Sequence, residues 1–259
     1  MIESHNSDIT FGDGYIQIEA TTTGGQYGKA LQHSTITLGD GNSNISLSAI
    51  EPENRETFSN GGYGAWDSTI NLNDGSDVLT INSNVDNSWA IGLAECTINM
   101  GSGEDSLSIT TLDRSRDTQP MSMSLRYCSS IDLGDDNDQL TINSDGSAIN
   151  NSTVLLGSGD DISTIVAERE CILDGTLRAG SGNDTLTLSG EASNFYNIGN
   201  TLYYQIAIGM KLLDSKVAKQ ELKDYGLYNF VKNNYNTITD QITNAIPGCI
   251  TTNEYYKKL

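Results

Sequence analysis

Apolar and polar residues alternate on both sides of a Gly-rich turn, and this pattern recurs along most of the chain. Seven segments align without gaps: ITFGDGYIQIEA, ITLGDGNSNISL, INLNDGSDVLTI, INMGSGEDSLSI, IDLGDDNDQLTI, VLLGSGDDISTI and LRAGSGNDTLTL. Their turns begin at Gly12, Gly39, Asn73, Gly101, Gly134, Gly157 and Gly180. A period of two predicts short strands with one face turned inward, and these segments lack helical periodicity.

Apolar positions form columns when the seven segments are stacked. The second residue before each turn is Ile9, Ile36, Ile70, Ile98, Ile131, Val154 or Leu177. One segment alone cannot bury its apolar face, but segments stacked about 4.8 Å apart place each of these residues on its counterpart. The sequence therefore predicts an all-β fold, a parallel β-helix (β-solenoid) of about seven rungs, for residues 1–191.

Longer intervals between turns indicate insertions. Successive turns are 23 to 34 residues apart, and the longest intervals include EPENRETFSNGGYGAW and LDRSRDTQPMSMSLR, which their Pro residues mark as loops on one flank. Such loops often bind ligands, whereas ordinary irregular excursions are the alternative. Candidate contacts with a surface glycan or a protein receptor are Arg55, Trp66, Trp89, Arg114 and Arg116.

The pattern changes after Gly190. Apolar residues then recur at helical spacing, at positions 202, 206, 210, 213 and 217 and again from 227 to 246. We therefore expect a second domain, residues 192–259, with two amphipathic helices. It is expected either to cap the open end of the β-helix, whose unpaired strand would otherwise aggregate, or to serve as a secretion or partner-binding segment.

Charge narrows the range of partners. The formal net charge is −20, and residues 1–191 hold 29 Asp and Glu against 7 Lys and Arg. Phosphate groups would be repelled, so neither nucleic acid nor an anionic membrane is an expected partner, and multivalent cations are favoured. No apolar run approaches the roughly 20 residues of a membrane span.

The acidic residues concentrate at the fifth position of the turns. This position holds Asp in five consecutive segments: Asp77, Asp105, Asp138, Asp161 and Asp184. Stacked carboxylates would repel each other by about 1–3 kcal/mol per neighbouring pair, whereas a cation in each gap converts repulsion into coordination. Four gaps predict about four Ca²⁺ ions that are coupled to folding. The first two turns have Ile16 and Ser43 instead and are expected to bind weakly or not at all.

Gly residues in the turns permit the backbone conformations that aim carbonyl oxygens at a cation, and Ca²⁺ takes about 6–8 oxygen ligands. Extra acids at Asp74, Glu104, Asp135, Asp136 and Asp160 either add ligands or raise the local field. The alternative is that Gly, Asn and Asp simply make good turns. Beside the five Asp residues, the predicted ligand set is Gly75, Gly101, Gly103, Gly134, Asp136, Gly157, Gly159, Gly180 and Gly182.

The turns GSGEDSLSI, GDDNDQLTI, GSGDDISTI and GSGNDTLTL resemble the nonapeptide G-G-x-G-x-D-x-U-x of the RTX (repeats-in-toxin) calcium-binding proteins. The resemblance covers residues 8 to 190. It implies Ca²⁺ binding and a C-terminal, uncleaved signal for type I secretion, hence an extracellular or cell-surface location; the N-terminus has no signal-peptide pattern. One feature differs: an RTX β-roll has a metal turn every nine residues, whereas this chain has one in 23 or more.

The four cysteines do not show zinc-ligand spacing. Cys96 and Cys128 occupy similar places in successive repeats and are candidates for a stacked or bridged pair. The two histidines, His5 and His33, fit no catalytic or metal arrangement and are expected to be incidental.

These features predict a non-enzymatic, calcium-binding structural or adhesive module, complete or part of a larger polypeptide. One alternative is a β-helical polysaccharide lyase or epimerase-like enzyme that uses Glu95, Arg126 and Arg169. A third is ice or flat-surface binding through an outward ladder of hydroxyl side chains. That ladder would contain Glu19, Ser46, Thr80, Ser108, Thr141, Thr164 and Thr187.

Overall fold

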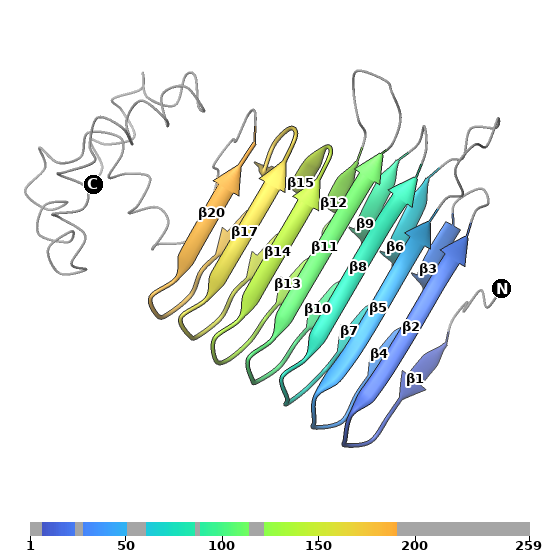
Figure 1. The fold of residues 1–259 in the computed structure, drawn as a ribbon, viewed down its shortest axis with the longest axis vertical. Coiled ribbons are helices and arrows are strands. Elements are labelled where there is room, and N and C mark those ends of the chain that lie inside the picture. The colour runs from blue at the N-terminus through green and yellow to red at the C-terminus, as the bar shows by residue number, and fades with distance from the viewer. Residues whose placement is uncertain (1–6, 24–27, 51–60, 86–88, 114–121, 191–259) are drawn as a thin grey trace, which may run out of the picture. The chain divides into compact units, whose positions relative to one another are not determined.

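The computed structural model of the chain describes residues 7–23, 28–50, 61–85, 89–113 and 122–190. These residues form a parallel β-helix of three sheets, and all of them belong to the first of two units of the chain, Met1–Asn197. In Figure 1 the strands of successive rungs lie side by side from the N-terminal to the C-terminal end of this unit. The described residues contain no helix, and no membrane-spanning helix is found among them.

A sheet of seven short strands precedes the turns. Its register pairs Ile9 with Ile36, Ile70 with Ile98 and Val154 with Leu177, so the predicted apolar stacking is confirmed. We call it the short sheet; its strands are β1 (Asp8–Thr10), β4 (Thr35–Thr37), β7 (Thr69–Asn71), β10 (Thr97–Asn99), β13 (Ser130–Asp132), β16 (Thr153–Leu155) and β19 (Thr176–Arg178).

A second seven-stranded sheet follows the turns, and we call it the long sheet. Alternate residues such as Leu79, Ile81 and Ser83 are buried, and they stack on Leu107, Ile109 and Thr111. Its strands are β2 (Ile16–Thr23), β5 (Ser43–Ile50), β8 (Val78–Val85), β11 (Ser106–Asp113), β14 (Gln139–Ser144), β17 (Ile162–Ala167) and β20 (Thr185–Ser189).

A third sheet was not predicted from the sequence, and two of its six strands lie in the two segments that were expected to be loops. Trp66 belongs to one of its strands, so the prediction that this residue lies on a flanking loop is wrong. Trp89 lies outside the strands and immediately precedes one of them. The third sheet contains β3 (Gly28–Gln32), β6 (Gly62–Trp66), β9 (Ala90–Ala94), β12 (Met123–Arg126), β15 (Ser147–Asn150) and β18 (Ile172–Leu173).

Small residues allow this third sheet to approach the long sheet closely. A Cβ on Gly64 would come within 2.3 Å of Ile81 Cγ2, and one on Gly92 within 2.6 Å of Ile109 Cγ2. Because glycine has no Cβ, the two sheets can pack directly against each other at these positions. The same glycines interrupt the alternation of apolar and polar residues by which the strands could have been predicted from the sequence.

Seryl side chains connect the rungs at the corner between the third and short sheets. The backbone N–H of Ser34 donates to Ser68 Oγ (3.2 Å), and that of Cys96 donates to Ser129 Oγ (3.3 Å). Cys96 therefore stacks on Ser129, while Cys128 lies one residue earlier, and the structure records both cysteines as free. The predicted stacking of Cys96 on Cys128 is wrong, because Cys96 lies five residues before its turn at Gly101, whereas Cys128 lies six residues before its turn at Gly134.

Several sequence predictions lie outside the described residues. They are the helices and the capping or secretion role of residues 192–259, together with Arg55, Arg114, Arg116, His5 and Cys249.

Candidate metal site

Backbone conformation divides the seven turns into two groups. In the last five turns the first residue is left-handed: Asn73 (φ 65°), Gly101 (109°), Gly134 (106°), Gly157 (112°) and Gly180 (96°). Gly12 and Gly39, which begin the first two turns, lie outside that range. The left-handed group is also the group that has Asp at the fifth position.

Stacking explains why Gly occupies the first position. A Cβ on Gly134 would lie 1.8 Å from the carbonyl oxygen of Gly101, and one on Gly157 would lie 1.8 Å from that of Gly134. The same carbonyls accept hydrogen bonds from Asp135 N–H (3.0 Å) and Ser158 N–H (2.9 Å). Close stacking of the rungs thus accounts for these glycines without a metal.

Each Asp at the fifth position accepts a hydrogen bond from the preceding rung through Oδ1. The backbone N–H donates to Oδ1 in five successive bonds: Ser43 N–H to Asp77 (2.6 Å), Asp77 N–H to Asp105 (2.8 Å), Asp105 N–H to Asp138 (2.9 Å), Asp138 N–H to Asp161 (2.9 Å) and Asp161 N–H to Asp184 (3.1 Å). The structure therefore brings all five predicted Asp residues into one continuous row, which we call the Asp column.

The second carboxylate oxygen has no partner. Oδ2 of each of the five Asp residues is buried and accepts no hydrogen bond, and the first four side chains are at most 2 % exposed. A buried ionised oxygen without a donor or a cation is strongly unfavourable. The five orphaned oxygens run along the inside of the turns, which is where a row of cations would neutralise them.

Burial raises the pKa of every carboxyl in the Asp column. The pKa of Asp105 rises to about 7 and that of Asp138 to about 8, first through desolvation and then through neighbouring carboxylates, including Asp136. The backbone hydrogen bond that each carboxylate accepts lowers its pKa, but by less than burial raises it. The pKa of Asp77, Asp161 and Asp184 is raised by the same burial. Without a cation, Asp105 and Asp138 therefore hold protons near neutral pH.

A cation at the Asp column would take its other oxygen ligands mainly from the backbone. Within the described residues no three acidic, histidine or cysteine side chains converge as a metal-binding group. The third turn position is left-handed at Gly75, Gly103, Asp136, Gly159 and Gly182. Carbonyls of the first and second positions are engaged in the inter-rung hydrogen bonds, whereas those of the third position are not part of that ladder. We expect third-position carbonyls to complete the oxygen set.

The first two rungs lack the carboxylate. Ile16 and Ser43 stack directly on each other at the fifth position. The Ser43 hydroxyl donates to the carbonyl oxygen of Gly41 (3.3 Å), so it is satisfied within its own turn. The last five rungs therefore contain all the orphaned oxygens of this column.

Acids at the second and fourth turn positions lie on the outside of the turns. Ser158 Oγ donates to Asp135 Oδ1 (2.5 Å), and Asp160 Oδ1 accepts from the Asn183 N–H (2.7 Å). Both carboxylates are exposed. These carboxylates therefore add negative charge around the turns rather than serving as ligands of an interior site.

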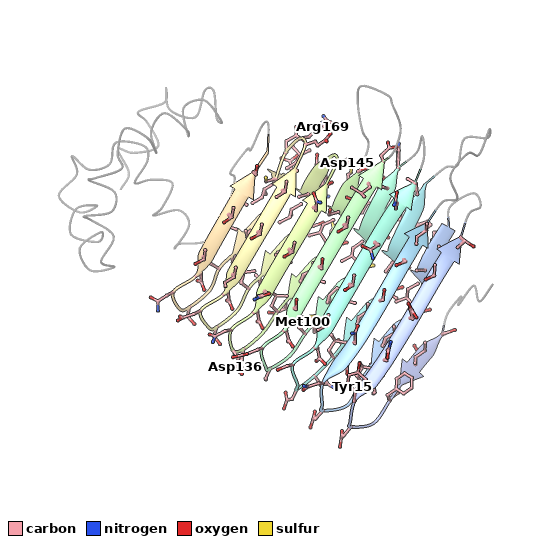
Figure 2. All side chains as sticks on the ribbon, in the orientation of Figure 1. Tyr15, Met100, Asp136, Asp145 and Arg169 are labelled. Carbon is pink, nitrogen blue, oxygen red and sulfur yellow. The ribbon has the colours of Figure 1, made fainter. Side chains whose placement is uncertain are left out.

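Other candidate residues are dispersed. Glu95 and Arg126 lie on adjacent rungs at one corner, joined by a Glu95 N–H to Arg126 carbonyl bond (3.3 Å). Arg169 lies at the edge opposite the turns, as Figure 2 shows by comparison with Asp136. The structure does not bring these three proposed enzyme residues together. His33 Nδ1 lies 2.7 Å from Asp67 Oδ2.

Two tryptophans of the candidate ligand-contact set each lie beside a cationic side chain. The Lys29 ammonium lies 4.1 Å from the Trp66 ring centroid, and Tyr63 stacks on Trp66 at 5.5 Å. The Arg126 guanidinium lies 4.5 Å from the Trp89 ring centroid. Sequence analysis selected both tryptophans, and Arg126 for a different role, but it did not select Lys29 or pair either cation with a tryptophan, because the third sheet has no clear sequence signal.

Comparison with protein-family models found no match, and searches among curated proteins and solved structures found no significant similarity.

Proposed function

We propose that this chain is a calcium-dependent structural or adhesive module, in which Ca²⁺ ions bind along the Asp column and stabilise the stacked turns. The observation that carries the proposal is the row of five buried, unpartnered Oδ2 atoms. The hydrogen bonds to Oδ1 need only one acceptor oxygen, which Asn would also provide. A carboxylate at five successive positions is therefore better explained by a cation.

Calcium fits this oxygen set better than magnesium or zinc. Ca²⁺ accepts irregular shells of carboxylate and carbonyl oxygens, whereas Mg²⁺ requires near-octahedral geometry and Zn²⁺ prefers nitrogen and sulfur ligands. The resemblance of the turns to the RTX nonapeptide supports the same choice. Sites with few carboxylates belong to the class with dissociation constants of about 10⁻⁴–10⁻³ M, which suits a secreted or cell-surface bacterial protein.

Metal content and thermal melting test the proposal. We expect the metal-free chain to take up about four Ca²⁺ ions, one for each gap between carboxylates, and to melt at least about 5 °C higher in saturating Ca²⁺ than in chelator. Melting followed by circular dichroism, together with elemental analysis, measures both quantities. Absence of bound calcium and an unchanged melting temperature would refute the proposal.

A second function, binding to a flat surface such as ice, is favoured by one observation. The outward residues of the long sheet from β5 to β20 include no charged side chain, although the chain has a net charge of −20. Ser, Thr, Asn and Gln predominate there, with exposed Ile50, Val78, Ile162 and Val166 between them. This face would be the display surface of the module.

Ice-growth measurements test this second function. Wild type is expected to shape ice crystals, and Thr141→Lys, at the centre of the uncharged face, is expected to abolish that effect. Asn42→Lys, on the turn edge, is the matched control. Normal ice growth with wild type would remove this candidate while leaving calcium binding intact.

A further inference from the structure

One rung departs from the leucine column of the long sheet. Ser163 occupies the position that Leu140 fills on one side and Leu186 on the other. Its residue is 0 % exposed, and its Oγ is buried without a hydrogen-bond partner. A leucine would continue the core at this position, so the serine weakens packing and leaves a polar atom unsatisfied.

The unsatisfied hydroxyl lies beside the Asp column. Asp161, Ser163 and Ile165 are buried on one face of their strand, whereas Ile162 is exposed on the other. Asp161 and Ser163 are thus neighbours on that face, about 6.8 Å apart along the strand. Asp161 Oδ2 is also buried and unpartnered, so one face of the sixth rung contains two orphaned oxygens from residues two positions apart.

Elsewhere in the interior, most buried hydroxyls are bonded. Thr111 Oγ1 lies 3.0 Å from both Ser124 Oγ and Ser144 Oγ, and Ser83 Oγ donates to the Gly62 carbonyl (2.7 Å). Ser122 Oγ is unpartnered too, but it precedes β12 of the third sheet rather than lying on the strand that follows a metal turn. Ser163 is therefore distinguished by its position next to an orphaned carboxylate.

We propose that Ser163 supplies an additional oxygen, directly or through one bridging water, to a Ca²⁺ ion held by Asp161, so that this site differs from the others in the column. The inference rests on the proposed calcium binding. A carboxylate oxygen and a hydroxyl oxygen on one strand face can share an ion whose ligand distances are about 2.3–2.6 Å, or a water between them. Occupancy would satisfy both atoms and explain the break in the leucine column.

Calcium titration of the full chain, by calorimetry and by terbium luminescence, tests the inference. Ser163→Ala keeps the small volume and removes the oxygen, and Ser163→Leu restores the leucine column. We expect both variants to weaken one site by about 10–100-fold and to leave the remaining sites unchanged. Ser122→Ala, which removes the other unpartnered hydroxyl, is expected to bind Ca²⁺ as wild type does.

Unchanged affinities and ion number in Ser163→Ala would overturn this inference and make the serine a packing defect. The same holds if Ser163→Leu raises the melting temperature with no change in calcium binding. A wild-type chain that binds no Ca²⁺ would instead refute the proposed function itself, so the two failures are distinguishable.

Discussion

The backbone N–H of Asp105 donates a 2.9 Å hydrogen bond to Oδ1 of Asp138, the equivalent residue one rung further along. This contact fixes the carboxylate against the neighbouring turn and leaves its Oδ2 buried without a partner. Because the arrangement repeats over five rungs, neighbouring carboxylates repel each other, and the charges of Asp105 and Asp161 raise the pKa of Asp138. Protons and the proposed Ca²⁺ ions would therefore compete for the same row of oxygens.

Stability of the metal-free chain is expected to fall as pH rises. Burial raises the pKa of Asp105 to about 7 and that of Asp138 to about 8, whereas the unfolded chain titrates these groups near about 4. Between about pH 4 and pH 8 the folded state binds more protons than the unfolded state, so the free energy of unfolding decreases across that range. Urea unfolding of calcium-free protein at pH 5, 6, 7 and 8 measures this decrease.

Saturating Ca²⁺ is expected to reduce or reverse that trend, because the ion replaces the protons and binds best to ionised carboxylates. A metal-free chain whose stability increases from pH 5 to pH 8 would contradict the burial of uncompensated carboxylates.

Replacing one carboxylate by its amide separates charge from hydrogen bonding. Asp138→Asn retains an oxygen that accepts the Asp105 N–H, but it removes a charge from the centre of the column. At a pH above about 8, where the Asp138 carboxyl is ionised, we expect the metal-free variant to be more stable than wild type by about 1–3 kcal/mol, since repulsion from two neighbours is lost. We expect a smaller gain in stability on adding Ca²⁺. Urea unfolding with Ca²⁺ and with chelator measures both effects.

The control for this variant is Asp40→Asn, which removes an exposed carboxylate from a turn outside the Asp column. Its stability is expected to remain within about 0.5 kcal/mol of wild type in both conditions. If Asp138→Asn and Asp40→Asn respond equally, the effect arises from net charge rather than from the column.

Sequence periodicity was sufficient to predict the register of the short and long sheets. Ile36 and Ile70 stack as expected, because a period of two and a Gly turn together specify which face of each strand is buried. The Asp column was predictable for the same reason, since each Asp has a constant offset from its turn.

The third sheet was not predictable in this way. In β9, Ala90, Ile91, Leu93 and Ala94 are all fully buried, so no alternation marks the strand. The segments between turns also differ in length, which hides the pairing of Trp66 with Ala94. The break at Ser163 was visible as a missing leucine, but only its burial reveals that the hydroxyl is unsatisfied.

A methyl group at the first turn position is expected to disrupt stacking. The Cβ of Gly157→Ala would meet the Gly134 carbonyl oxygen at 1.8 Å, and the residue has a φ of 112°. We expect a loss of at least about 2 kcal/mol in the free energy of unfolding, with or without Ca²⁺. Gly12→Ala is the matched control, because a Cβ there meets nothing within 4 Å. Equal stability of the two variants, measured by urea unfolding, would contradict the stacked geometry.

Cysteine reactivity is expected to report on the integrity of the stacked core. Cys128 is exposed, whereas Cys96 and Cys171 are buried, and burial raises the pKa of the Cys96 thiol to about 12. Because the thiolate is the reactive form, brief alkylation at neutral pH is expected to modify Cys128 while sparing the two buried thiols. Peptide mass mapping after quenching identifies the modified residues, and alkylation in urea provides the fully labelled reference.

Calcium links this readout to the Asp column. With Ca²⁺ bound as proposed, its removal is expected to lower the free energy of unfolding, so chelator should speed the labelling of Cys96 and Cys171 through transient opening, with no change at Cys128. Asp138→Asn should show a smaller effect of chelator than wild type. Rapid labelling of Cys96 in saturating Ca²⁺ would mean that the corner between the third and short sheets opens independently of the turns.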